Sequence, residues 1–86
     1  MLKIAIVGCG KIADSHAAQI KRIRGCEIVG VCDREPLMAR QLSERYPAKA
    51  YYSDLGTLLR ESRPDVVHIT TPPQSHFELA KTCIKS

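Results

Sequence analysis

The sequence predicts an α/β fold, in which a parallel sheet carries helices on both faces. Short continuous apolar runs alternate with segments whose apolar residues recur at helical spacing. This alternation is typical of strand–helix–strand units with right-handed crossovers. With 44% hydrophobic and 26% charged residues, the composition is that of a globular domain, not of a disordered tail or a collagen-like repeat. At 86 residues the chain is at most one domain, with room for a modest core.

The first three elements are predicted from one apolar run, one periodic segment and a second apolar run. Residues 4–7 form a short strand that ends at Gly8, and residues 28–32 form a second strand that ends at Asp33. Between them we expect a helix that ends at Gly25 as its C-cap. Its apolar face would consist of Ile12, His16, Ala17, Ile20 and Ile23.

The second half of the chain continues the alternation. Pro36 suits the first turn of a helix that ends at Tyr46-Pro47. Residues 48–52 predict a weak third strand, and residues 66–70 a fourth. We expect the apolar side of the Pro36 helix to be made of Leu37, Met38, Leu42 and Tyr46.

Two further helices are predicted from their caps. Asp54 caps a short helix that carries Leu55, Leu58 and Leu59. After the loop at 71–73, Ser75 and Glu78 form a capping box that begins a helix running to the last residues.

The formal net charge of +4 is compatible with nucleic acid, a membrane surface or an anionic cofactor. The positive residues are scattered, and their tightest group, residues 21–24, lies where a helix should end. With three Tyr, one Phe and no Trp, the chain has no aromatic platform for base stacking. We therefore expect neither nucleic-acid nor membrane binding. No long apolar run or signal-peptide pattern is found, so we expect a cytoplasmic location.

The four cysteines contain no Cys-x-x-Cys pair for zinc or thiol redox chemistry, and we expect reduced, structural thiols. Cys9 differs because it lies in a glycine loop, where a thiol can be accessible. Among the histidines, we expect His16 to pack inward and His68 to lie in the core or face a helix. His76 begins the last helix and is either exposed or close to a cofactor. No metal-ligand or Ser-His-Asp pattern is present.

The residues that indicate a binding site follow the first strand. Residues 8–13 read Gly-x-Gly-x-x-Ala at the point where a strand gives way to a helix. In that context Gly8 permits a tight turn, Gly10 lets the backbone approach a pyrophosphate, and Ala13 allows close packing of helix on strand. Free N–H groups at the start of the helix would meet the phosphates.

Asp33 strengthens this interpretation. It ends the second strand, 23 residues after Gly10, near the spacing at which a carboxylate binds the adenosine ribose hydroxyls. The alternative role of Asp33 is to cap the Pro36 helix. Its charge favours NAD, whereas the neighbouring Arg34 could hold a 2′-phosphate, so NADP stays open.

Four stretches, residues 8–16, 30–34, 52–55 and 65–76, together resemble the Gfo/Idh/MocA family of glucose-fructose oxidoreductase, inositol dehydrogenase and rhizopine catabolism. The segment Asp-Val-Val-His-Ile-Thr-Thr-Pro-Pro-Gln-Ser-His is the most specific of them. The resemblance implies a Rossmann domain for NAD or NADP, a C-terminal substrate domain, and hydride transfer to or from sugars, cyclitols or polyols. It places Gly8, Gly10, Lys11 and Ile12 around the pyrophosphate, Asp33 and Arg34 at the adenosine ribose, and Thr70, Thr71, Pro72 and His76 toward the phosphates and nicotinamide.

Residues 1–86 thus hold four βα units, an incomplete domain for a Rossmann-like doubly wound sheet, and we expect the strand order 3-2-1-4. The family's lysine-bearing Glu-Lys-Pro motif is missing from these residues. We therefore expect a truncated oxidoreductase with no catalytic residue in this part, inactive alone. The fourth strand would be an exposed edge, and the hypothesis that follows is self-association through it, by strand addition or domain swapping.

Two other hypotheses about the function of the chain stay open. A non-catalytic Rossmann module could sense a dinucleotide or bind a protein partner. A methyltransferase also carries a ribose-binding acid after its second strand, but usually lacks a Thr-Pro-Pro exit loop like that at 71–73.

Overall fold

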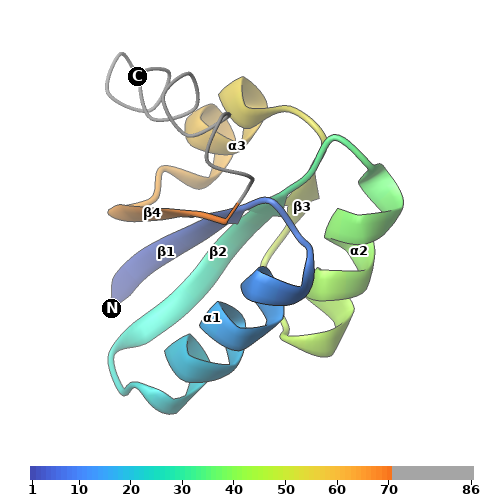
Figure 1. Ribbon diagram of the computed structural model, residues 1–86. Helices are drawn as coiled ribbons and strands as arrows, with labels where there is room; N and C mark the ends of the chain where they lie inside the picture. The colour runs from blue at the N-terminus through green and yellow to red at the C-terminus, as the bar shows by residue number, and fades with distance from the viewer. Residues whose placement is uncertain (71–86) are drawn as a thin grey trace.

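The computed structural model describes residues 1–70, and its strands and helices alternate as the sequence predicts (Figure 1). The four described strands are β1 (Leu2–Val7), β2 (Cys26–Cys32), β3 (Tyr51–Tyr52) and β4 (Val66–Ile69). They form one sheet in the order β3-β2-β1-β4, and every pair is parallel. The predicted fold class and strand order are thus confirmed. The helix expected from Ser75 onward lies outside the described residues.

The helices divide between the two faces of the sheet. Helices α1 (Lys11–Arg22) and α2 (Pro36–Arg45) cover one face, and α3 (Leu55–Ser62) covers the other (Figure 1). The core on the first face centres on Ile6, Ile28 and Leu42, and the smaller core under α3 centres on Leu58. Removal of these side chains from water supplies the main stabilisation of so small a domain.

Gly30 permits the close approach of α3 to β2. A Cβ atom at this position would lie 3.1 Å from the Tyr52 ring and 3.4 Å from both Leu58 and Ser62. The glycine inside β2 is therefore a packing requirement of the α3 face.

The cap at the start of α3 is confirmed. The Asp54 carboxylate accepts hydrogen bonds from the backbone N–H and the hydroxyl of Thr57, each at 2.9 Å. These two bonds lower the pKa of Asp54. The predicted C-cap at Gly25 is wrong, because α1 ends at Arg22 and its C-cap residue is Ile23. Gly25 instead takes a φ of +84° in the turn into β2, and its carbonyl accepts the Leu2 N–H at 2.6 Å.

The apolar faces expected for the first two helices are also partly wrong. The inward residues of α1 are Ala13, Ala17 and Ile20, and those of α2 are Ala39 and Leu42. Small alanines let both helices approach the sheet closely, so the larger side chains beside them remain outside. The expected core residues left exposed are Ile12 (61%), Ile23 (54%), Leu37 (61%) and Met38 (37%).

The parallel topology places the carboxyl ends of all strands at one edge of the sheet. The chain runs outward from β1 through β2 to β3, then crosses back to place β4 on the other side of β1. This reversal beside β1 is a topological switch point, the position where open α/β sheets bind ligands.

Candidate functional site

The turn after β1 has a backbone that only glycine adopts without strain. Gly8 has a φ of +91°, in the left-handed region, and its N–H donates to the Cys32 carbonyl at 2.8 Å. This bond fastens the start of the loop to the end of β2. The loop then enters α1 with Gly10 as the N-cap residue.

Gly10 is a glycine for a different reason. Its φ of −85° and ψ of −161° are open to any residue, and a Cβ added there would meet nothing within 4 Å. The rest of the described chain therefore does not require a glycine at this position. Because Gly10 has no side chain, the space beside it is open, and another molecule can approach the backbone there.

The first N–H groups of α1 follow directly after Gly10 in the chain. The Gly10 carbonyl accepts the first bonds of the helix, from Ala13 at 3.1 Å and Asp14 at 3.3 Å. The preceding N–H groups, those of Lys11 and Ile12, have no acceptor within residues 1–70. Unpaired donors at a helix N-terminus, together with the helix dipole, form a favourable position for an anion.

Asp33 joins the two loops at the carboxyl edge of the sheet. Its Oδ2 accepts the Cys9 N–H at 2.8 Å, and its Oδ1 accepts the Glu35 N–H at 2.8 Å. The carboxylate is thus held between the glycine loop and the start of α2, where Glu35 is the N-cap residue. The Glu35 N–H precedes the helix and α2 has no side-chain cap, so the alternative role of Asp33 as the cap of this helix is wrong. Each carboxylate oxygen retains a second acceptor position, so Asp33 can also accept bonds from a ligand.

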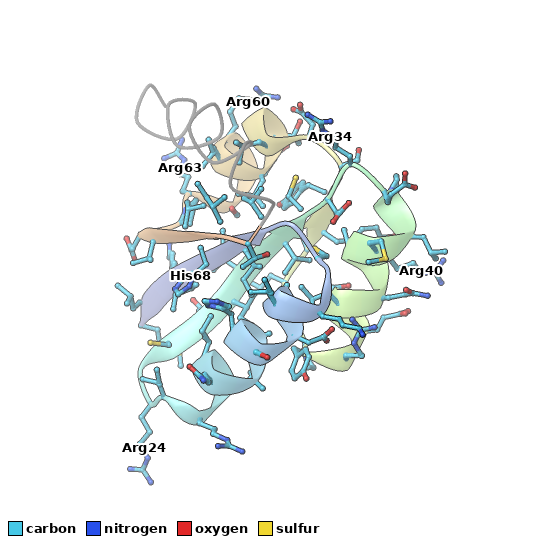
Figure 2. All side chains as sticks on the ribbon, viewed as in Figure 1. Arg24, Arg34, Arg40, Arg60, Arg63 and His68 are labelled. Atoms are coloured by element: carbon cyan, nitrogen blue, oxygen red, sulfur yellow. The ribbon has the colours of Figure 1, made fainter. Side chains whose placement is uncertain are left out.

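The other predicted residues of the first two loops are exposed around this centre. Lys11 and Ile12 are exposed in the first turn of α1. Arg34 extends from the loop after β2 (Figure 2). Their positions at the strand ends are those that the sequence predicts, but no contact within residues 1–70 fixes the Arg34 head group.

Thr70 closes the site on the β4 side. Its N–H donates to the Val7 carbonyl at 2.9 Å, and its hydroxyl donates to the carbonyl of Gly8. Thr70 therefore fastens the end of β4 to the glycine loop, a role that the spacing of the sequence did not indicate. Thr71, Pro72 and His76 lie outside the described residues.

Cys9 is not accessible, contrary to one expectation for a thiol in this loop. Its side chain is 1% exposed and its Sγ lies 3.3 Å from the Cys32 carbonyl oxygen. Burial and then the nearby Asp33 carboxylate raise the pKa of Cys9 to about 12, and burial raises the pKa of Cys32 to about 11. Both are inert apolar groups at neutral pH, so the loop contributes its backbone and not its thiol.

The two described histidines meet each other. His16 on α1 and His68 on β4 are both half-buried, with their Nδ1 atoms 3.3 Å apart. His16 packs inward and His68 faces a helix, as expected, but their contact across 52 residues was not predicted. Within residues 1–70 there is no group of three or more potential metal ligands. No helix in that part of the chain is long and apolar enough to cross a membrane.

Comparison with known proteins identifies the class to which this arrangement belongs. Residues 2–86 match the model of the GFO_IDH_MocA oxidoreductase family, which has an NAD-binding Rossmann fold. The chain belongs to this family. The resemblance found in the sequence is thereby confirmed, and with it NAD as the family's cofactor.

Among curated relatives, the chain is 33% identical to 4-carboxy-2-hydroxymuconate-6-semialdehyde dehydrogenase of Sphingobium, over 99% of this chain and 27% of the relative. It is 35% identical to D-glucoside 3-dehydrogenase of Escherichia coli K12, over 90% of this chain and 22% of the relative. The chain thus spans about a quarter of the length of the curated relatives it matches.

Solved structures agree on the fold. An oxidoreductase from Agrobacterium radiobacter in complex with NAD+, L-tartaric acid and magnesium has a TM-score of 0.89 and 30% identity, covering 98% of this chain and 25% of that one. Myo-inositol dehydrogenase from Lactobacillus casei, in complex with NAD(H) and myo-inositol, has a TM-score of 0.91 over 100% of this chain and 26% of that one. At 20% identity the second structure supports the fold alone.

Proposed function

We propose that the chain is the dinucleotide-binding part of an oxidoreductase that transfers a hydride between NAD and a sugar, cyclitol or polyol. The observation that carries the proposal is the Asp33 carboxylate, which two backbone N–H groups hold at 2.8 Å beside the open glycine loop. A fixed acceptor next to unpaired donors at a helix N-terminus suits a ribose joined to a pyrophosphate.

The residues of the site fit such a cofactor. The open space at Gly10 would admit the pyrophosphate to the backbone, and the N–H groups of Lys11 and Ile12 would donate to it. Asp33 would accept bonds from the hydroxyls of the adenosine ribose through its remaining acceptor positions. The nicotinamide, when bound, supplies the hydride chemistry, and the protein supplies position and electrostatics.

We propose NAD as the preferred cofactor over NADP. Because the Asp33 carboxylate is held by N–H groups on both sides, it cannot turn away from a 2′-phosphate without losing two charge-assisted bonds. Arg34 is exposed at the same edge and would have to outweigh that repulsion for NADP to bind well.

The substrate class rests on the relatives. Their names include D-glucoside 3-dehydrogenase and inositol 2-dehydrogenase, and these relatives are about four times as long as this chain. We propose that residues 1–86 form part of an N-terminal Rossmann domain and that a further domain selects the substrate and supplies the catalytic residues. The chain alone would then bind cofactor without turnover. Thr71, Pro72 and His76 are proposed to contribute to the phosphate and nicotinamide side of the site.

We also propose a cytoplasmic location. Within residues 1–70 the three cysteines are free thiols, as is typical of a reducing compartment.

Calorimetric titration of the chain with NAD, NADP and S-adenosylmethionine tests the proposal. We expect NAD to bind more tightly than NADP, and S-adenosylmethionine not to bind. Gly10→Ala adds a methyl group in the open space without disturbing an allowed backbone, so it should weaken NAD at least tenfold. Gln19→Ala, at an exposed position of α1 about two turns beyond the loop, is the control and should leave affinity unchanged. Binding of neither nicotinamide cofactor, or equal effects of both variants, would contradict the proposal.

A further inference from the structure

The contact between His16 and His68 joins helix α1 to the edge strand β4 of the described sheet. The ring centroids lie 5.3 Å apart with the planes at 68°, and the Nδ1 atoms face each other at 3.3 Å. Figure 2 shows the His68 side chain extending from β4 on the α1 side of the sheet. Two imidazoles are fewer than the three or four protein ligands of a zinc site, so the contact is understood as a hydrogen bond.

This hydrogen bond depends on how many protons the pair carries. When both rings are neutral, one Nδ1–H donates to the other Nδ1. A first added proton is taken up at an Nε2 atom, and the Nδ1–H···Nδ1 bond persists in charge-assisted form. A second added proton leaves both Nδ1 atoms as donors, and it places two positive rings in direct contact. The hydrogen bond between the two rings therefore persists when the pair carries no or one positive charge, and it is lost when the pair carries two.

The surroundings offer no described carboxylate to offset a second charge. On α1, Asp14 is bonded to Arg45 of α2 at 2.9 Å. On the strands, Asp65 accepts the backbone N–H of Lys3 at 2.9 Å, and both of these residues are exposed. Burial and then the positive charge of its histidine neighbour lower the pKa of His68. The remaining charged groups of α1 are cationic and exposed: Lys11, Lys21 and Arg22.

The same strand ends at the candidate cofactor site. Two residues after His68, Thr70 donates its N–H to Val7 and its hydroxyl to Gly8. Strand β4 otherwise pairs only with β1 within residues 1–70. Loss of the contact between His68 and His16 would therefore loosen β4, the strand whose Thr70 is bonded to the glycine loop.

We propose that His16 and His68 form a pH-sensitive clasp between α1 and β4, closed with at most one added proton and opened by the second. Opening weakens the dinucleotide site through Thr70, a consequence that rests on the proposed function above. The clasp itself does not depend on that function.

The pH dependence of unfolding tests the clasp. Because its pKa is lowered on folding, His68 takes up a proton more readily in the unfolded chain, so stability present above about pH 6.5 is lost as the pH falls. We expect the folding equilibrium constant, from urea unfolding between pH 7.5 and 5, to fall by up to about tenfold per pH unit in the steepest part. The His68→Val variant keeps a residue suited to a strand and should lose this dependence. Equal slopes in the two proteins would overturn the clasp.

An NMR titration keeps the test decisive if His68→Val does not fold. In the folded wild-type chain, we expect the His68 ring to titrate below the ordinary midpoint of about 6.5. In His16→Leu, whose substituent favours helix, the midpoint should move upward because the positive neighbour is gone. An unchanged midpoint would show that the charge of His16 does not act on His68, and it would overturn the clasp.

Titration with NAD at pH 7.5 and 5.5 tests the link to the cofactor site. As the pH is lowered from 7.5 to 5.5, the affinity for NAD should decrease more steeply in the wild-type chain than in His68→Val. A pH-dependent stability with a pH-independent NAD affinity would refute the link alone. Absence of NAD binding at both pH values would instead refute the proposed function and, with it, the link.

Discussion

Replacement of Asp33 by asparagine tests the junction between the glycine loop and the start of α2. The carboxylate accepts the N–H groups of Cys9 and Glu35, each at 2.8 Å, through different oxygens. Asparagine has nearly the same shape but only one acceptor oxygen. Whichever way the amide turns, one backbone N–H loses its acceptor and faces an NH2 group.

The expected loss follows from these two bonds. A hydrogen bond to a charged group contributes about 1.5–3 kcal/mol, and Asp33 is only half-buried, so water replaces part of what is lost. We expect Asp33→Asn to reduce the free energy of unfolding by about 2 kcal/mol. For a domain of this size, that corresponds to a fall in Tm of roughly 8 to 16 °C. Urea and thermal unfolding followed by circular dichroism would measure both.

Asp65→Asn is the matched control for this variant. Asp65 accepts a single backbone N–H, that of Lys3 at 2.9 Å, and an asparagine oxygen can keep that bond. The bond changes from charged to neutral, a loss of about 1 kcal/mol or less. If Asp33→Asn cost no more stability than Asp65→Asn, this result would refute the conclusion that the two bonds of Asp33 join the glycine loop to the start of α2.

Three further results are expected. A thiol reagent at pH 8 should modify Cys26 well before Cys9 and Cys32, whose pKa values are raised to about 12 and 11; equally fast reaction of all three would contradict their burial. Asp54→Ala should lower the urea midpoint at pH 7 but not at pH 2, because the lowered pKa of the capping carboxyl gives stability that is lost as the pH falls below about 4; an equal loss at both pH values would exclude the charged cap. Strand β4 is an edge of the described sheet, and sedimentation at rising concentration should reveal self-association through it, whereas a monomer throughout would count against strand addition.

The alternation of strands and helices was predictable because it depends on local patterns. Apolar runs of four or five residues specify buried parallel strands, and Asp54 and Pro36 mark helix starts through their own side chains. The strand order was predicted from the doubly wound dinucleotide-binding fold that the glycine loop and Asp33 indicate. The helix faces were less predictable, because periodicity favours the large residues Ile12 and Leu37, whereas close approach to the sheet selects alanines.

The centre of the candidate site was predictable for a similar reason. The glycine spacing and the acid after the second strand place Gly8, Gly10 and Asp33 at one edge of any parallel sheet. The bonds that organise this edge were not predictable, because they join residues distant in sequence through the backbone. The Cys9 N–H on Asp33 and the Thr70 hydroxyl on Gly8 leave no signature in residue type or spacing.

The most direct test of the account is to map NAD binding on the backbone amides by NMR. We expect the largest shifts at the N–H groups of Gly10, Lys11 and Ile12, with smaller shifts at Asp33. No change is expected at Gly25, which lies at the opposite edge of the sheet. Shifts centred on the Gly25 edge, or scattered over the surface without saturation, would contradict the claim that the carboxyl ends of the strands bind the dinucleotide.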